Sequence, residues 1–475
     1  MKIRCILSII LIGGISSSFA QVINKQTISS DNQTPLVGCA SHELLLRLDD
    51  LNPGTLKKSN DYLKEVNADF QLAHSRATNE VYRIPVVFHV LYNNATENIP
   101  DSVFIQQMEI LNNAYRRQNT DTVNMRPDFI DVVGDSKIEF YLATTDPNGG
   151  VTNGIIHKQT QVTNFGGVLP YGASQQAQIQ QWVNDSLFYN YFSLTKDSLG
   201  GDDAWDTARY LNVWVGDLTI LEPQFNNVEE LVFFGLSTPP IAHANWPAAT
   251  MQQFAGLGDG TLMHYKAIGP NNPAPFVGTY SGYNGIANTG KMLVHEVGHY
   301  LGLRHIWGDG ACAEDDYVSD TPRANAASQY NCIKSTNSCV DTINGVDLPN
   351  MVENYMDYSA GNCQNSFTNG QAAVMRATIE NFRDSVIVNS VQDTDFANED
   401  MKLFPNPTSD NVRLEFREVL DKCTIQVLGL TGVVMNEIHL THVKSTQVIL
   451  PAVSGVYFIR VSSHSKMMTF KVVKR

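Results

Sequence analysis

Three histidines and one glutamate near residue 300 have the types and the spacing of a hydrolytic metal site. They lie in the run HEVGHYLGLRH and are His295, Glu296, His299 and His305. Residues four apart share one face of a helix, so His295 and His299 can bind one metal ion through their imidazole nitrogens. Glu296 lies beside them, where its carboxylate can reach a metal-bound water molecule rather than the metal.

A third ligand requires the chain to turn back after this helix. On a continuing helix His305 would point away from the face that carries His299. Gly302 allows the turn, because glycine readily adopts the left-handed conformation that ends a helix. Three nitrogen ligands and one open position are typical of catalytic zinc, whereas a structural zinc site is closed by four protein ligands.

This arrangement predicts hydrolysis of peptide bonds. Zinc lowers the pKa of a bound water molecule, and Glu296 can take that proton and later pass it to the leaving amine. Two other functions would use the same residues: a surface adhesin that retains a metal site without turnover, and a hydrolase of small amides. Protein cleavage that stops with a chelator separates the protease from the adhesin, and digestion of casein separates it from the amide hydrolase.

Four of the seven cysteines cluster in the sequence after this run: Cys312, Cys332, Cys339 and Cys363. In an exported protein such a cluster is typical of two disulfides, and three pairings are possible. A four-cysteine zinc site competes with this interpretation, but the expected C-x-x-C spacing is missing.

The elements that must position these residues mix strands and helices without regular alternation, which predicts an α+β fold. Runs of β-branched and aromatic residues predict strands, and apolar residues at helical spacing predict helices. The predicted strands cover residues 83–92, 210–215 and 260–268, and the predicted helices cover 44–66, 105–117, a stretch from 289 onward, and 368–382.

The composition and the start of the chain restrict the class of protein. The chain has 475 residues, 43% of them hydrophobic, and a formal net charge of −15, which argues against a nucleic-acid binder. Lys2 and Arg4, an apolar run over 6–15 and the small residues Ser18 and Ala20 predict a signal peptide cleaved after Ala20. No later stretch approaches about eighteen uninterrupted apolar residues, so we expect no transmembrane segment.

The HEVGHYLGLRH run resembles the zinc-binding signature of the metzincin clan of zinc endopeptidases. That clan also carries a methionine in a tight turn beneath the zinc, which matches Met356 in the run NYMDY. Tyr358 matches a tyrosine that helps to stabilise the tetrahedral intermediate in several members. The resemblance therefore implies a metzincin-type catalytic domain, with a twisted mixed sheet and an active-site helix.

Within the clan, the chain is most similar to the pappalysin family, especially its bacterial members. The motifs that carry this resemblance are IPVVFHVLY at residue 84, LNNAYRRQN at 111, YLNVWV at 210, GKMLVHEVGHYLGLRH at 290, NYMDYS at 354 and FTNGQ at 367. The family's disulfides correspond to Cys312–Cys339 and Cys332–Cys363. Its calcium ligands correspond to Asp316, the carbonyl of Val318 and Thr321, whose oxygen atoms suit calcium; a solvated acidic loop is the alternative.

Two further features concern the substrate. Bacterial relatives have an acidic pair shortly before the last of the disulfide cysteines, and one member lies in the pocket that prefers arginine after the scissile bond. The corresponding residues here are Ala360 and Gly361. An arginine preference therefore cannot be carried over, because it would need a carboxylate partner. The stretch 260–268 falls where metzincins keep the edge strand above the cleft, to which an extended substrate could pair; an ordinary interior strand is the alternative.

Cys39, in the polar leader before the catalytic domain, predicts latency. Its thiolate could be a fourth zinc ligand in the latent form and displace the catalytic water, and some pappalysin relatives have such a cysteine switch. A Cys39–Cys423 disulfide or an idle thiol is the alternative. Activation would then require a cut near the end of the leader, for which Ser75–Arg76 and Tyr82–Arg83 are candidate bonds.

The C-terminal part contains short alternating strands that predict a small all-β sandwich. The runs LFPNPT at 403, GVY at 455 and KVVKR at 471 resemble a type IX secretion sorting domain, which implies passage through that machinery and release or attachment at the cell surface; an adhesion module is the alternative. The predicted organisation is a signal peptide (1–20), an inhibitory propeptide (21–75), a zinc endopeptidase domain (76–390), a linker (391–402) and the sorting domain (403–475).

Overall fold

The computed structural model divides into two compact units, Met1–Ile387 and Val388–Arg475, which are described separately. It describes residues 36–72, 80–169, 186–224, 227–240, 258–276, 289–328, 331–341, 345–383, 386, 401–429, 434–463 and 466–475. The predicted signal peptide, the candidate bond Ser75–Arg76 and residues 391–400 of the predicted linker lie outside these residues.

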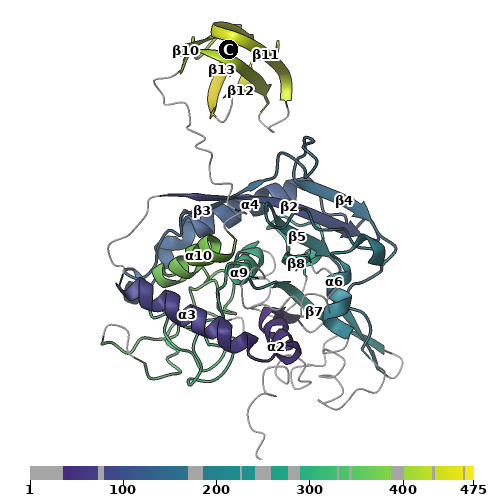
Figure 1. Ribbon diagram of the computed structural model, residues 1–475, viewed down its shortest axis with the longest axis vertical. Helices are drawn as coiled ribbons and strands as arrows, with labels where there is room; N and C mark the ends of the chain where they lie inside the picture. The colour runs from purple at the N-terminus through teal and green to yellow at the C-terminus, as the bar shows by residue number, and fades with distance from the viewer. Residues whose placement is uncertain are drawn as a thin grey trace, which may run out of the picture. The chain divides into compact units, whose positions relative to one another are not determined.

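The first unit is built on one mixed sheet of eight strands (Figure 1), which with its helices confirms the α+β prediction. The order is β1-β7-β8-β5-β2-β3, and β4 also pairs with β2 and β6 with β7. The strands are β1 (Leu36–Cys39), β2 (Tyr82–Tyr92), β3 (Ile138–Leu142), β4 (Ile155–Gln159), β5 (Leu211–Gly216), β6 (Thr219–Gln224), β7 (Asn227–Ser237) and β8 (Gly260–His264).

Strand β2 lies inside the sheet and pairs in parallel with β3, β4 and β5. Its side chains from Ile84 to Leu91 are all buried, His89 included. A near-continuous apolar run is what a strand covered on both faces requires, so the dense β-branched stretch RIPVVFHVLY forms this strand.

The prediction that residues 260–268 form the edge strand is wrong. Strand β8 lies between β5 and β7, and it ends at His264, where a 3₁₀ turn over Tyr265–Ala267 follows. Strand β7 runs antiparallel to β8 on the outer side. The leader's β1 pairs in parallel with β7, with Leu36 opposite Val232 and Cys39 opposite Gly235. The leader therefore occupies the outer side of β7.

Six α-helices pack around this sheet in the described residues: α2 (Ser41–Leu51), α3 (Thr55–Leu72), α4 (Asp101–Tyr115), α6 (Phe188–Ser193), α9 (Lys291–Tyr300) and α10 (Asn369–Phe382). Shorter 3₁₀ segments cover Thr120–Asn124, Pro127–Phe129 and Asp197–Leu199. Helix α9 contacts α4, β7 and β8, and the leader helix α3 lies along α10 (Figure 1).

The leader has two helices where the sequence predicts one. The chain breaks between α2 and α3 at Asn52–Gly54, because Pro53 cannot continue a helix and Gly54 adopts a φ of +98°. None of the helices in the described part of the chain is long and apolar enough to cross a membrane.

The second unit is all-β, as predicted, and has its own apolar core. By hydrogen bonding its strands form one five-stranded sheet rather than two separate sheets, in the order β11-β10-β12-β13 with β9 also on β10. The strands are β9 (Met401–Phe404), β10 (Asn411–Leu428), β11 (Val434–Ile449), β12 (Gly455–Ser463) and β13 (Lys466–Lys474). The pairing of β10 with β11 shifts register between Glu415 and Leu420.

Candidate active site

Helix α9 places His295, Glu296 and His299 in the buried interior of the first unit. It begins after Gly290, which has a φ of +71°, and ends at Tyr300. One helical turn separates the two histidines, and their Nε2 atoms lie 3.1 Å apart. The spacing of four therefore brings both nitrogens to one point, as the sequence predicts.

Gly302 turns the chain back after α9. Its φ is +92°, a conformation that favours glycine, and an added Cβ would lie 2.5 Å from Thr378 Oγ1. The turn returns His305 to the helix face, where its Nε2 lies 3.1 Å from that of His299.

The other ring nitrogen of each histidine faces a hydrogen-bond acceptor. His295 Nδ1 donates to the carbonyl of Tyr355 at 2.7 Å, and His299 Nδ1 donates to the carbonyl of Leu303 at 2.9 Å. His305 Nδ1 donates to the carboxylate of Asp309. These bonds fix the tautomer of each ring, so that the three Nε2 lone pairs converge.

This donor set fits zinc. Three converging lone pairs have no hydrogen atom between them and would repel one another without a cation. Zinc–nitrogen bonds of about 2.0–2.1 Å at tetrahedral angles place two nitrogens about 3.3 Å apart, close to the 3.1 Å found here. Burial lowers the pKa of His295 to about 3 and that of His299 well below its ordinary value, so these rings are neutral and can coordinate.

Cys39 of the leader completes the cluster. Its sulfur and the three histidine nitrogens all lie within 4.8 Å of one another, and this is the metal-binding group found among the described residues. The structure has Cys39 and Cys423 as free cysteines rather than as a disulfide pair. Cysteine sulfur together with imidazole nitrogen is a zinc ligand set.

Glu296 lies next to this cluster and carries two leader contacts. Its Oε2 accepts from the Cys39 thiol at 3.3 Å and from the Ser41 hydroxyl at 3.1 Å. Burial raises the pKa of Glu296 to about 8, because the ionised carboxylate loses its hydration. A carboxyl group with a pKa in this range can both take and return a proton near neutral pH.

Tyr358 contacts the backbone of Cys39. Its hydroxyl accepts from the Cys39 amide at 2.8 Å and donates to the Cys39 carbonyl at 3.0 Å. The ring lies 5.6 Å from that of His295 and 5.0 Å from that of His305, centroid to centroid. Gly38 allows this approach, since a Cβ there would lie 2.6 Å from the Tyr358 ring.

Met356 is fully buried beneath α9. An added Cβ on Gly298 would lie 2.5 Å from the Met356 sulfur, so the glycine of HEVGH lets the methionine pack directly under the helix. The neighbouring carbonyl of Tyr355 is the one that orients His295. The segment with Met356 therefore supports the first histidine as well as filling the core.

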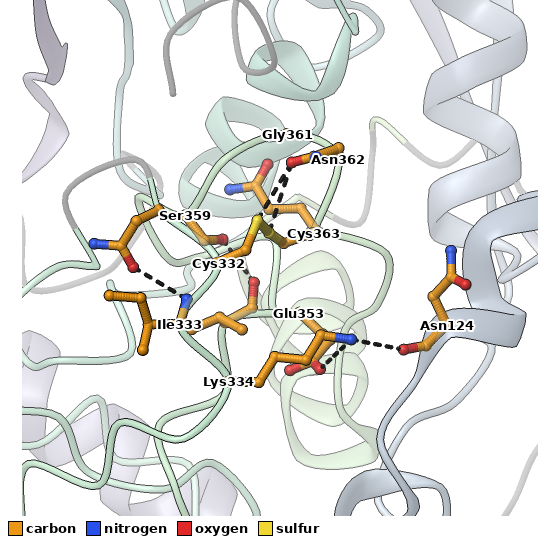
Figure 2. Close-up of a disulfide and its surroundings, with 12 residues drawn as sticks. Asn124, Cys332, Ile333, Lys334, Glu353, Ser359, Gly361, Asn362 and Cys363 are labelled. Carbon is orange, nitrogen blue, oxygen red and sulfur yellow. Dashed lines mark hydrogen bonds and ion pairs between the residues drawn. A yellow bond between two sulfur atoms is a disulfide. The ribbon is translucent and has the colours of Figure 1, made fainter. Parts of the chain in front are cut away.

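Two disulfides join the pairs that the resemblance implies, Cys312–Cys339 and Cys332–Cys363. Figure 2 shows the second bond, which ties Cys332 to the segment with Ser359, Gly361 and Asn362. Beside it, Lys334 reaches the carboxylate of Glu353 at 3.8 Å and the carbonyl of Asn124 at 3.3 Å (Figure 2).

The segment over residues 360–361 has an ammonium group as its neighbour. Lys291 Nζ donates to the carbonyl of Gly361 at 2.8 Å and pairs with Asp121 at 2.6 Å. Lys291 lies one turn before His295 on α9, so the two residues share one face of the helix.

The predicted calcium ligands lie together in the loop after the first disulfide cysteine. The Thr321 hydroxyl is 2.8 Å from Asp316 Oδ2 and 2.7 Å from the Val318 carbonyl oxygen. Burial, followed by the charge of Asp315, raises the pKa of Asp316 well above its ordinary value. A buried carboxyl group with a hydroxyl and a carbonyl oxygen beside it gives three oxygen ligands, which suit a hard cation.

Several contact residues had no signal in the sequence. Ser41 accepts from the amide of Ser237 at 2.8 Å while its hydroxyl donates to Glu296, and His42 pairs with Asp309 at 3.0 Å. The pairing of the leader strand with the edge of the sheet brings these residues together, so no local spacing in the sequence predicts these contacts. Asp309, four residues after His305, is the one that a search for ligand-orienting carboxylates could have found.

Comparisons with known proteins agree with this geometry. The profile of the family described as Pregnancy-associated plasma protein-A matches residues 270–380, and that of the Secretion system C-terminal sorting domain matches residues 402–475. A promirolysin variant from Tannerella forsythia is 30% identical, with a TM-score of 0.52; the match covers 76% of this chain and 98% of that one. A structure of mirolysin with a bound compound is 32% identical, with a TM-score of 0.50, and covers 68% and 98%.

The curated relatives match a shorter segment. An extracellular metalloprotease from Arthroderma otae is 42% identical over 97 residues, which are 20% of this chain and 34% of that protein. The match thus spans about a third of that relative's length.

The mixed sheet, the helix α9 with two histidines and the third histidine after the turn at Gly302 define a metzincin-type fold. This chain belongs to the pappalysin-type family of zinc metalloendopeptidases, and its C-terminal sorting domain marks it for secretion or attachment at the outer-membrane surface.

Proposed function

We propose that the chain is a secreted zinc-dependent endopeptidase made as a latent zymogen. The observation that carries the proposal is the convergence of His295, His299 and His305 beside the buried carboxyl group of Glu296. The three nitrogens would hold zinc, which when bound supplies Lewis-acid activation of a water molecule. Protein substrates follow from family membership and from the edge strand next to the site.

Glu296 is the group that moves the proton in this proposal. Its carboxylate would accept a proton from the attacking water and return it to the amine of the leaving peptide. The pKa of about 8 in the leader-bound form supports this, because a buried carboxyl group is easily protonated and deprotonated near neutral pH. Family membership sets the reaction class, and this residue assignment is our own inference.

Tyr358 would stabilise the negative charge that develops on the carbonyl oxygen of the substrate. Its ring lies beside the histidine rings, and in the latent form its hydroxyl bonds the amide and the carbonyl of Cys39. When the leader leaves and these two bonds are lost, the hydroxyl would donate to the substrate instead. A preorganised donor of this kind acts at the position where charge develops.

The leader would keep the enzyme latent in two ways. The Cys39 sulfur would close the zinc site with a fourth protein ligand, and the Ser41 hydroxyl would occupy the Glu296 carboxylate. Strand β1 also covers β7, where an extended substrate would add to the sheet. Activation would require a cut after the leader, for which Ser75–Arg76 stays a candidate bond, and then release of the leader. The other candidate bond, Tyr82–Arg83, lies inside strand β2, where both residues pair with β3, so a protease cannot reach it without opening the sheet.

We also propose a structural calcium ion at Asp316, the Val318 carbonyl and Thr321. The Asp316 carboxyl group is buried and lies beside the Thr321 hydroxyl and the acidic Asp315, and a cation there would offset this buried negative charge. In zinc-buffered solution, calcium is expected to raise the melting temperature of the wild type but not of Asp316→Asn. An equal melting temperature with and without calcium in the wild type would remove the calcium site.

Export would use the type IX secretion machinery, which the sorting domain of residues 402–475 addresses. The predicted signal peptide supplies the first membrane passage.

Casein digestion by the leader-free chain tests the proposal. We expect cleavage that a zinc chelator stops and zinc restores, and a loss of about 10²–10⁴-fold in Glu296→Gln, the range for general acid–base catalysis. Equal zinc content in the variant shows that the metal site is intact. Wild-type chain that binds zinc and cuts neither casein nor short peptides would instead favour the adhesin.

A further inference from the structure

A pocket beside the metal cluster is lined on one side by the leader and on the other by the catalytic domain. The leader contributes His42, Ser59 and Leu63, and the domain contributes Ser237, Arg304 and Asp309. His299 also lines it, so the pocket adjoins the metal ligands. When the leader leaves, this side of the cleft opens for substrate.

Asp309 is the fixed anionic group of this pocket. One of its carboxylate oxygens accepts from His305 Nδ1, and the other lies 3.0 Å from the imidazole of His42. Asp309 adopts a φ of +58°, an uncommon conformation that aspartate tolerates better than most residues. Contacts with two imidazoles, one on each of its oxygen atoms, hold the carboxylate in place.

The leader runs along β7 as far as Cys39 and then turns into helix α2, whose first turn places the basic side chain of His42 on this carboxylate. Cys39 lies at the metal cluster, β1 pairs with β7, and His42 follows three residues after Cys39. The His42 and Asp309 side chains are only 11% and 6% exposed. We propose that Asp309 reads a basic side chain of the substrate, Lys or Arg, on the side of the metal that the leader covers after Cys39. This deepens the proposed function and rests on it.

Arg304 has the opposite charge in the same pocket and must be weighed against Asp309. Its guanidinium donates to Ser59 Oγ at 3.1 Å and to Asn60 Oδ1 at 2.7 Å, both in the leader. Burial lowers the pKa of His42, but the charge and hydrogen bond of Asp309 and the charge of Glu43 together outweigh this burial and the weaker opposing charge of Arg304, so that the pKa is raised. A cation at the His42 position is therefore stabilised overall.

Asp309 should favour a basic substrate side chain and Arg304 should disfavour it. Variants of these two residues should therefore shift the preference in opposite directions, which gives a sharp test. The chain is freed of its leader by added protease, checked by N-terminal sequencing, and given peptides that carry Lys or Gln at each position around one scissile bond in turn. The readout is the ratio of kcat/KM for the Lys and Gln peptides at each position. This ratio cancels any general loss of activity, which matters because Asp309 also orients His305.

We expect one position at which wild type favours Lys by about tenfold, the size of one charge-assisted hydrogen bond. Asp309→Asn, which keeps an oxygen acceptor for His305, should bring the ratio close to one. Arg304→Gln should raise it by removing the repulsion. Zinc content is measured for all three proteins.

A wild-type ratio near one at every position, with the Gln peptides cleaved, would overturn this inference and leave the proposed function intact. So would an unchanged ratio in Asp309→Asn or a lowered ratio in Arg304→Gln, which would mean that Asp309 and Arg304 pair with each other once the leader is gone. No cleavage of any peptide by the zinc-loaded wild type would overturn the proposed function and this inference together.

Discussion

The hydroxyl of Tyr358 bonds both the amide and the carbonyl of Cys39, and it lies within the group of rings around the metal cluster. One side chain would thus hold the leader in the latent form and stabilise the developing charge in the active form. At the scale of the residue, latency and catalysis depend on the same atoms. Removing that one oxygen atom should therefore weaken both properties: the leader should be released faster, and the leader-free enzyme should be slower.

Tyr358→Phe is expected to slow the leader-free enzyme by about 10²-fold, the low end for loss of one oxyanion donor. The same change should speed activation of the full-length chain, because two hydrogen bonds to Cys39 are lost. Casein digestion before and after leader removal measures both effects. Equal rates for variant and wild type in the leader-free form would exclude Tyr358 from catalysis.

Residues whose roles follow from local spacing could be predicted from the sequence. The turn at Gly302 and the convergence of the two helix histidines need only a few residues of chain. The contacts of Ser41 and His42 could not be predicted, because β1 brings them to the site from about 250 residues away. The contact between the Lys291 ammonium group and the carbonyl of Gly361 could not be predicted either, because the two residues are far apart in the sequence and meet only in the fold.

At the scale of the element, the central strand β2 and the helix α9 follow from their apolar patterns. The edge of the sheet does not, since β8 and β7 both carry apolar residues and only pairing decides which lies outside. The leader shows the same limit: residues 44–66 have a helical pattern, but Pro53 and Gly54 divide them into two helices. Tertiary pairing and turn residues overrode the local pattern in these places.

The leader helix α3 should be held mainly by its buried face. Leu63 is 2% exposed and packs in the main core of the first unit, whereas Lys58 on the same helix is exposed. Leu63→Ala should weaken leader attachment by about 2–5 kcal/mol, the usual range for a buried leucine. Its leader should then be released faster by a limiting dose of protease.

Lys58→Ala is the matched control for that experiment, because it removes an exposed side chain from the same helix. Leader release is followed by gel electrophoresis over time. If Leu63→Ala and Lys58→Ala lose the leader at the same rate as wild type, helix packing does not hold the leader in place.

At the scale of the whole molecule, two units with separate cores share one chain. The apolar core of the second unit consists only of residues from 401 onward, and none of them belongs to the cores of the first unit. The residues of the proposed catalytic site all belong to Met1–Ile387. We therefore expect the sorting domain to serve export rather than the reaction.

Removing residues 388–475 should leave zinc content and casein digestion unchanged, and the free energy of unfolding of the first unit unchanged within about 0.5 kcal/mol, as for changes far from a core. Calorimetry of the full-length chain and the shortened chain measures this. A shortened chain that loses zinc or unfolds at a lower temperature would show that the second unit supports the first.

The most direct measurement compares casein digestion by the full-length wild type, Cys39→Ala and the double variant Cys39→Ala with Glu296→Gln, each with zinc and with a chelator. We predict that the Cys39→Ala chain loses its leader and digests casein sooner than the wild type, because one of the leader's contacts is removed, and that the chelator stops this digestion. The double variant should bind zinc and stay inactive. If Cys39→Ala binds zinc and digests nothing even after its leader is removed, or if the double variant remains as active as Cys39→Ala, the account of a latent zinc endopeptidase with Glu296 as its base is wrong.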